Sequence, residues 1–292
     1  MGISFARFRR GVLATTACFA FACVANADFV LVDDFESYAV GTTPVGQGSG
    51  WSTNLTTNLA HGFGVALDPA GSGNQVARLN IENPRYVANS NHVIPDGNVG
   101  TLLFQIYRPE TSSVLDMAAG FTAEFTGTNG WLSAGDFATP LRINNNADLL
   151  QIYDSNGFAE VTEPEGLSPL PGGEWYTVWM VADTNTDTWT LYVEGGEYEE
   201  QTQVQAGSIS EFGFRGGTGA ADLLHFGFLA NASQGANMPV YLDNFYVDTD
   251  SMPGGNLSNP IPEPASLMLL GLGSLAMLAR RRKTTAEDET LG

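Results

Sequence analysis

The region between the two ends of the chain, residues 28–250, is predicted to fold as an all-β sandwich. No helical period persists through it, and short apolar or alternating runs recur between clusters of Gly, Asn, Asp and Pro. The 292 residues include 34 glycines and 14 prolines, which indicates many turns. Because 43% of the residues are hydrophobic, the chain can build a substantial core, and a sandwich of this size is commonly a single domain.

Segments rich in β-branched and aromatic residues are spaced regularly along this region. Turn-forming residues separate them, which is typical of a sandwich or barrel. We expect strands near residues 29–35, 63–67, 75–81, 99–108, 117–125, 149–153, 174–183, 188–194, 209–214, 223–229 and 239–248.

The first 27 residues have the pattern of a signal peptide. Residues 1–10 are basic and residues 11–24 are apolar. The small residues Ala25 and Ala27 then occupy positions −3 and −1 of the expected signal peptidase cleavage site. An uncleaved membrane helix is the alternative, although the apolar run is short for one.

The C-terminal end combines a proline motif, an apolar run and a basic cluster. Pro262, Glu263 and Pro264 precede the 15 apolar residues 265–279. A helix of that length measures about 22 Å, so it spans a hydrocarbon core of about 30 Å only if flanking residues and arginine side chains extend its reach. The basic cluster should keep the tail, residues 284–292, in the cytoplasm and leave the domain outside. This cluster consists of Arg280, Arg281, Arg282 and Lys283.

This arrangement over residues 261–283 resembles the PEP-CTERM sorting signal, which exosortases recognise in Gram-negative bacteria that produce exopolysaccharide. The resemblance implies a transient anchor in the inner membrane, cleavage near Glu263 and transfer to the cell surface or extracellular matrix. Residues 251–260, rich in Pro, Gly, Asn and Ser, are then expected to form a flexible linker. The tail is longer than is usual for this signal, and an ordinary membrane tail is the alternative.

The charge of the expected domain excludes one class of partner. Residues 28–250 carry 28 acidic residues against five arginines and no lysine, a formal charge of −23. A surface this negative repels phosphate backbones, so nucleic-acid binding is not expected. The charge suits cation binding or simple solubility outside the cell. Both cysteines, Cys18 and Cys23, precede the domain, which excludes a disulfide framework in the mature protein.

Two β-rich runs, residues 174–183 and 188–195, flank a polar turn and predict a hairpin. The Trp-initiated first run and the Leu-Tyr-Val-x-Gly ending of the second resemble the central hairpin of concanavalin A-like, or laminin-G-like, jelly rolls. The opening residues 32–38 with Trp51, and the closing residues 240–247, are similar to the first and last strands of the same superfamily. The resemblance implies a jelly-roll β-sandwich.

A structural calcium site is implied by the same resemblance. In such jelly rolls the first and last strands lie side by side, and a calcium ion often bridges them with a glycine-rich turn. Glu36, Gly73 in the turn 71–74, and Asp243 occupy the corresponding places, with Asp33 and Asp34 as possible substitutes. Ca²⁺ takes six to eight hard oxygen ligands. The alternative is that these acids are solvated residues at strand ends.

A glycan-facing patch is suggested by a repeated Gln-Ile-Tyr sequence. Strand alternation places Gln105 and Tyr107 on one face, and likewise Gln151 and Tyr153. Amides and phenols on one sheet can bind a polysaccharide by hydrogen bonds and stacking. The alternative is an ordinary, partly buried sheet face. Further candidates for the patch are Trp131, Arg142 and Trp179.

Catalytic patterns find little support in the sequence. The three histidines are far apart, and no Gly-x-Ser-x-Gly elbow occurs. The Glu-x-Asp-x-(x)-Glu pattern of concanavalin A-like glycosidases is absent from the body, and without lysine the body cannot supply the Tyr-x-Lys of alginate-lyase-like relatives. We therefore predict a non-enzymatic surface or matrix protein, a calcium-stabilised jelly roll that contacts exopolysaccharide or another envelope component. A carbohydrate-active enzyme with an unusual site and a purely structural spacer are the alternatives.

Overall fold

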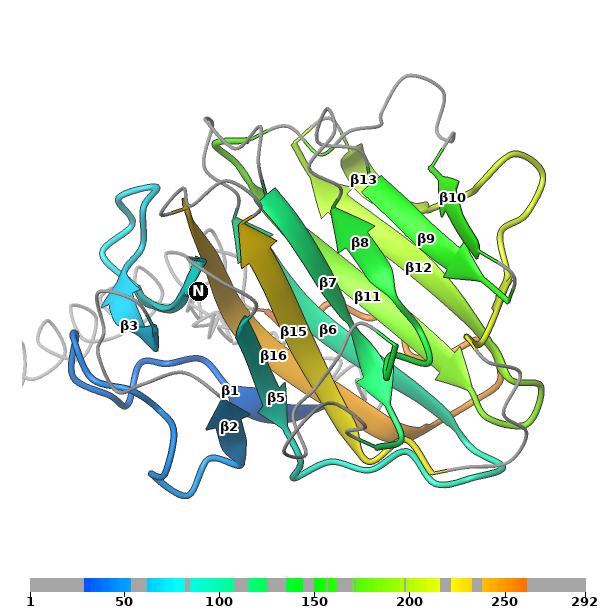
Figure 1. Ribbon diagram of the computed structural model, residues 1–292, viewed down its shortest axis with the longest axis horizontal. Helices are drawn as coiled ribbons and strands as arrows, with labels where there is room; N and C mark the ends of the chain where they lie inside the picture. Colours follow the sequence, from blue (N-terminus) through cyan, green and yellow to red (C-terminus); the bar gives the residue numbers. More distant parts are fainter. Residues whose placement is uncertain are drawn as a thin grey trace, which may run out of the picture.

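The computed structural model consists of two facing antiparallel β-sheets, with no helix in the ranges it describes (Figure 1). The predicted all-β sandwich is confirmed. In the same ranges, no segment forms an apolar helix of membrane-spanning length. The expected signal peptide and residues 262–292, which carry the proline motif, apolar run and basic cluster, lie outside the described residues. The structure describes residues 29–53, 62–81, 85–107, 115–124, 135–143, 150–155, 157–161, 170, 172–196, 198–215, 222–232 and 238–261.

Sheet A contains nine of the described strands. Seven follow the order β13-β12-β11-β6-β16-β4-β3, while β1 also pairs with β16 and β14 with β12. Their bounds are β1 (Val30–Asp33), β3 (Phe63–Leu67), β4 (Gln75–Ile81), β6 (Val99–Tyr107), β11 (Trp175–Asp183), β12 (Thr188–Gly195), β13 (Tyr198–Gln203), β14 (Phe212–Gly213) and β16 (Met238–Ser251).

Sheet B contains the other seven described strands, in the order β10-β9-β8-β7-β15-β5-β2. Figure 1 looks onto this sheet, with the strands of sheet A behind it. The bounds are β2 (Trp51–Thr53), β5 (Arg85–Asn89), β7 (Leu115–Thr122), β8 (Leu141–Ile143), β9 (Leu150–Asp154), β10 (Gly157–Glu160) and β15 (His225–Ala232).

The core between the sheets is rich in aromatic rings. Phe245 of β16 stacks on Phe104 and on Phe226, each with 5.8 Å between ring centroids, and it meets Trp51 edge-on at 5.1 Å. All four side chains are at most 4% exposed. Offset and edge-to-face pairs of this kind add to the free energy gained from burying the rings. Since they come from both sheets, they fix how β16, β6, β15 and β2 lie relative to one another.

The expected central hairpin is present. Strands β11 and β12 pair from Thr177↔Glu194 to Asp183↔Thr188, and residues 184–187 form the turn. Asp187 ends this turn in the left-handed region, with φ 54°, a conformation that Asp tolerates better than most residues.

Five short strands were not expected from the sequence: β2, β5, β8, β10 and β13. Strand β8 has only three residues, and β13 lies at an edge of sheet A, where the side chains of residues 199–201 are exposed. Short strands offer too few residues for a pattern to be recognised: β8 alternates only as Leu-Arg-Ile, and residues 86–89 of the inner strand β5 are all buried, so they do not alternate. Edge strands such as β13 need not alternate, because one face stays exposed.

The expected flexible linker, residues 251–260, differs in the structure. Residues 252–260 lie against the outer face of sheet A, and the backbone amide of Asn256 donates to Thr101 Oγ1 at 2.9 Å. The Asn256 side chain donates to Asp248, and the Leu257 carbonyl accepts from the Gln201 amide. We call residues 252–260 the docked segment. The polar, glycine-rich composition predicted flexibility, but it did not reveal that polar groups of sheet A form hydrogen bonds with the segment.

Candidate functional site

The two Gln-Ile-Tyr sequences do not form one patch. The first lies on β6 in sheet A and the second on β9 in sheet B. In both, the isoleucine is buried in the core, so the glutamine and tyrosine point to the outer face of their own sheet. Because the outer faces of a sandwich point in opposite directions, Gln105 and Tyr107 lie on the far side of the molecule from Gln151 and Tyr153. The expectation of a single sheet face was wrong.

On sheet A, the first pair is engaged in local packing. Gln105 Oε1 accepts a hydrogen bond from Asn244 Nδ2 at 2.8 Å, and Gln105 Nε2 donates to Thr177 Oγ1 at 3.3 Å. Tyr107 packs against the rings of Trp175 and Tyr241, with centroids 5.5 Å and 6.0 Å away. Both polar ends of the Gln105 amide thus have protein partners.

On sheet B, arginine and aromatic side chains form a continuous group on the outer face, which we call the arginine–aromatic cluster. Tyr153 of β9 and Phe158 of β10 are cross-strand neighbours with ring centroids 5.2 Å apart at 90°. The guanidinium of Arg142 lies 5.2 Å from the Phe158 centroid, and that of Arg215 lies 4.7 Å from the Tyr153 centroid. Both distances are within the range of cation–π attraction.

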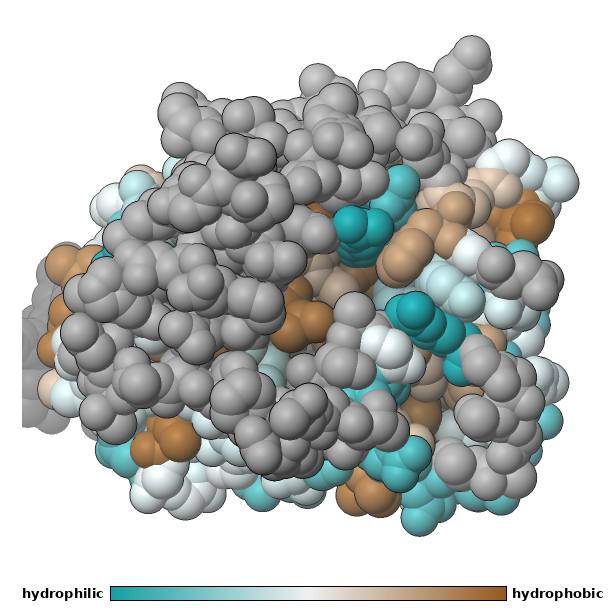
Figure 2. All heavy atoms as spheres, viewed as in Figure 1, coloured by the Kyte–Doolittle hydropathy of each residue, from teal (hydrophilic) through white to brown (hydrophobic). Residues whose placement is uncertain are grey.

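This cluster is accessible from outside. Phe158 is 37% exposed, and Arg142, Tyr153 and Arg215 are half-buried. Figure 2 looks onto this face, and hydrophilic and hydrophobic residues lie next to each other over the part formed by β8, β9 and β10. Two of the five arginines of an otherwise acidic domain are gathered here.

Gln151 lies beside this cluster, directly across the ladder from Arg142. It is 9% exposed, and its Oε1 is buried without a hydrogen-bond partner among the described residues. Most buried polar atoms in folded proteins are hydrogen-bonded, so an acceptor without a donor needs an explanation.

Phe158 and Arg215 were missed in the sequence. The short run 157–160 has too few residues to show alternation, and Arg215 follows the two-residue strand β14. The scarcity of basic residues was a usable signal, because each of the five arginines in so acidic a body merits attention.

Two tryptophans of the expected glycan patch are not placed in it. Trp131 lies outside the described residues. Trp179 points to the outer face of sheet A, where it is fully buried and its indole N–H donates to the Ser258 carbonyl at 3.1 Å. The docked segment covers this ring, so Trp179 offers no face to a ligand. Leu103, opposite Trp179 on β6, is also fully buried.

At the other end of the sandwich, two of the residues expected to bind calcium lie near each other, since the charge of Glu36 acts on Asp243. Strands β1 and β16 pair, with Val30↔Val247 in register. Glu36 follows β1 and reaches the turn before β4, because the backbone amide of Gln75 donates to Glu36 Oε1 at 2.8 Å. Gly73, in this exposed turn, has φ 88°, a conformation that glycine adopts without strain. We call the region formed by Asp34, Glu36, Asp68, the turn at Gly73 and Asp243 the acidic junction.

Asp243 is the most perturbed group of the acidic junction. The pKa of Asp243 is raised to about 8, and burial is the largest cause. The backbone amide of Asn244 opposes the rise, while the charges of Glu36, Asp34 and Asp68 contribute to it. For Asp68, burial also raises the pKa, but hydrogen bonds from Ser72, Ala70 and Trp175 outweigh it and leave a net lowering. The junction therefore concentrates negative charge around a carboxyl group that resists ionisation.

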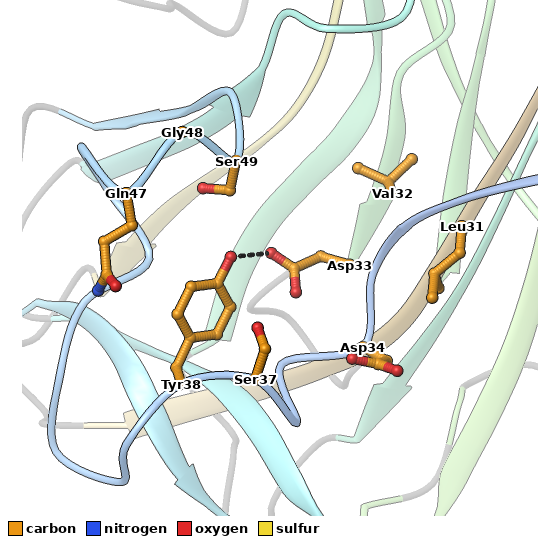
Figure 3. Close-up of a pocket in the computed structure, with 9 residues that line it drawn as sticks. All are labelled: Leu31, Val32, Asp33, Asp34, Ser37, Tyr38, Gln47, Gly48 and Ser49. Atoms are coloured by element: carbon orange, nitrogen blue, oxygen red, sulfur yellow. Dashed lines mark hydrogen bonds between the residues drawn. The ribbon is translucent and has the colours of Figure 1, made fainter.

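Asp33 is committed to structure. One of its oxygens accepts from the Phe35 amide at 2.9 Å, and the other accepts from the Tyr38 hydroxyl and the Trp51 indole at 2.8 Å and 2.9 Å. Figure 3 shows the Tyr38 hydroxyl directed at Asp33; both residues and Asp34 line a pocket of about 440 Å³. Asp33 is thus a poor substitute ligand for an ion. Asp34 accepts a hydrogen bond from the Glu36 backbone amide at 3.2 Å.

The negative charge of the acidic junction suits a cation, but the positions of its described side chains do not form a set of metal ligands. Within the described ranges, no three histidine, cysteine, aspartate or glutamate side chains form a group able to hold a metal ion. Carboxylates of Glu36 and Asp243 and carbonyls of the turn 71–74 supply hard oxygens, as Ca²⁺ requires. Buried negative charge without a positive partner is costly, and a cation would relieve that cost.

Comparison with known proteins gives one match for the C-terminal motif and several structural similarities for the folded domain. Residues 260–283 match the model of the PEP-CTERM protein-sorting motif. No curated protein gives a significant sequence match. Among solved structures, the catalytic domain of the glycoside hydrolase family 131 protein from Coprinopsis cinerea is similar with a TM-score of 0.51 at 13% identity, covering 81% of this chain and 95% of that one. Lectin II from Ulex europaeus is similar with a TM-score of 0.45 at 10% identity, covering 74% and 98%. The chain is thus a jelly-roll sandwich with a PEP-CTERM motif.

Proposed function

We propose that this chain is an exported protein, processed by signal peptidase and an exosortase, whose jelly roll contacts glycan without catalysis. The PEP-CTERM motif supports export, transient anchoring in the inner membrane and sorting to the cell surface. Exopolysaccharide of the surface or extracellular matrix is the proposed partner.

The arginine–aromatic cluster is the single observation that carries the glycan proposal. The exposed Phe158 ring and the half-buried Tyr153 ring provide apolar faces against which the C–H groups of a sugar can pack. Guanidinium groups beside these rings are donors for sugar oxygens. An extended sheet face that presents both is suited to a chain ligand more than to a small molecule in an enclosed pocket.

The test is binding of the purified full chain to a panel of soluble polysaccharides, by affinity electrophoresis and calorimetry. Phe158→Ala should weaken binding about 3- to 10-fold, because a ring contact of this kind is worth about 0.5–1.5 kcal/mol. Tyr107→Ala on sheet A is the matched control and should leave binding unchanged. If the full chain binds no glycan, or if Tyr107→Ala and Phe158→Ala weaken it equally, the proposal fails. Release of new reducing ends would instead make the chain an enzyme.

We further propose that Ca²⁺ stabilises the acidic junction without taking part in ligand binding. Glu36, Asp243 and the backbone of the turn at Gly73 would hold the ion. The support is the concentration of carboxylates around Asp243, whose ionisation is disfavoured in the absence of a counter-charge.

A further inference from the structure

The two Gln-Ile-Tyr sequences provide an internal comparison that narrows the ligand class. On the outer face of sheet A, both polar atoms of the Gln105 amide are hydrogen-bonded, to Asn244 and Thr177. On the outer face of sheet B, Gln151 Oε1 is buried and has no partner among the described residues. The two glutamines therefore differ in their hydrogen bonding. The Gln105 amide is fully paired, whereas the Gln151 amide has, within the described part of the chain, an unpaired oxygen beside the arginine–aromatic cluster.

We infer that the sheet B face takes a neutral, hydroxyl-rich glycan, with Gln151 Oε1 accepting a hydrogen bond from a sugar hydroxyl. This inference rests on the proposed function. An unpaired buried acceptor destabilises the free domain, and a ligand that brings a hydrogen-bond donor to it removes that cost. A sugar hydroxyl is such a donor, whereas a carboxylate is an acceptor only, so the open acceptor requires a hydroxyl-rich ligand. Uronic acids also carry hydroxyls, so the preference for a neutral glycan rests on the charge of the domain.

Access to this oxygen requires a small rearrangement of the amide. Gln151 Oε1 is shielded in the free domain, but the terminal torsion of glutamine is broad and roughly two-fold. Rotation of the amide can therefore turn the oxygen toward a sugar laid against Arg142, its partner across the ladder on β8, and against the Phe158 ring beside that guanidinium.

The overall charge of the domain favours the same ligand class. The domain carries 28 acidic residues and five arginines, so its net charge repels a polyanion. Arg142 and Arg215 attract an anion only within a few ångströms, and beyond that distance the repulsion dominates. At low ionic strength the screening length is about 30 Å, so this repulsion reaches well outside the surface. A neutral polysaccharide meets no such barrier. Arg142 and Arg215, each placed over an aromatic ring, then serve as donors to ring and hydroxyl oxygens.

The test compares binding of neutral glucans and galactomannan with binding of polygalacturonate and alginate, using the full chain at 10 mM and 150 mM salt. Neutral glycans should bind with affinities that differ less than about twofold between the two salt concentrations, because they carry no charge. Tighter binding of the uronates, weakened by salt, would show that the arginines form an anion site and would overturn the inference while leaving the proposed function intact. Absence of any glycan binding would reject the proposed function itself.

A matched pair of variants tests the role of the open acceptor. Gln151→Met keeps the length of the side chain and removes the oxygen, so it should weaken neutral-glycan binding about 10-fold while the Tm stays the same or rises. Gln105→Met removes a satisfied amide, so it should lower the Tm by a few degrees and leave binding unchanged. If Gln151→Met lowers the Tm as Gln105→Met does, or leaves binding unchanged, Gln151 has only a structural role and the inference is wrong.

Discussion

The buried carboxyl group of Asp243 predicts an unusual dependence of stability on pH. The folded pKa is raised from 3.8 to about 8, mainly by burial. Between these two values, the unfolded chain has released the proton that the folded domain retains. Raising the pH through this window therefore favours unfolding, and the stability contributed by the protonated group is lost as the pH approaches and passes the folded value.

The size of the effect follows from the two pKa values. With 3.8 in the unfolded chain and about 8 in the folded domain, the free energy of unfolding should fall by about 4 kcal/mol between pH 5 and pH 9. Asp243→Asn removes the titrating group while keeping its size. We expect the variant to lose this pH dependence and, in the absence of divalent cations, to be more stable than the parent at pH 9.

Urea unfolding of both proteins, followed by tryptophan fluorescence in EGTA at several pH values, measures the difference directly. The comparison between parent and variant cancels the titration of all other groups. If the parent and Asp243→Asn lose stability in parallel between pH 5 and pH 9, to within about 1 kcal/mol, then Asp243 ionises freely and the description of the acidic junction is incorrect.

Three further predictions concern the junction, the docked segment and the sorting motif. After treatment with EGTA, Ca²⁺ at 100 times its Kd should stabilise the domain by about 2.7 kcal/mol, and Asp243→Asn should abolish most of this gain; an unchanged Tm in the parent would remove the ion from the proposal. Gly254→Ala and Gly255→Ala both place a side chain at positive φ. Only at residue 255 does the new Cβ come within 2.5 Å of Val181. Proteolysis between residues 252 and 260 should therefore be faster in Gly255→Ala alone. Equal proteolysis of the two variants would show that the segment is not held on the sheet. Replacing Pro262, Glu263 and Pro264 by alanine should leave an unprocessed form in the inner membrane fraction, whereas normal processing would contradict the exosortase assignment.

The fold was predictable from the sequence because long buried strands leave a clear pattern. Strand β11 is buried in seven of its nine residues, and its turn into β12 contains polar residues only. The pairing of β1 with β16 followed from the resemblance of the first and last strands to those of known jelly rolls, not from any local pattern. Strand β8 escaped prediction because three residues are too few to establish a pattern, and β13 because residues 199–201 of this edge strand are polar and exposed.

The candidate site was predicted only in part, because alternation assigns a face but not a sheet. Gln105 and Gln151 stand in the same Gln-Ile-Tyr sequence, and this shared sequence does not reveal that β6 and β9 belong to different sheets. Whether an amide is satisfied also depends on residues far along the chain: Asn244, which pairs with Gln105, lies 139 residues away. Phe158 and Arg215 join the site through contacts of the same non-local kind.

The docked segment changes how the sorting motif relates to the domain. Composition suggested a tether that would separate the two, yet the Ser258 carbonyl is hydrogen-bonded to Trp179 in the middle of sheet A. From Ser258 to Glu263 the chain extends at most about 18 Å, since an extended residue spans no more than about 3.6 Å. While the segment remains docked, a membrane enzyme that cleaves near Glu263 must therefore work next to the folded sheet. A larger separation requires the segment to leave Trp179, exposing a side chain that is fully buried in the docked state. The apolar outer face of sheet A thus sets the energetic cost of extending the linker, which the composition of residues 251–260 alone could not indicate.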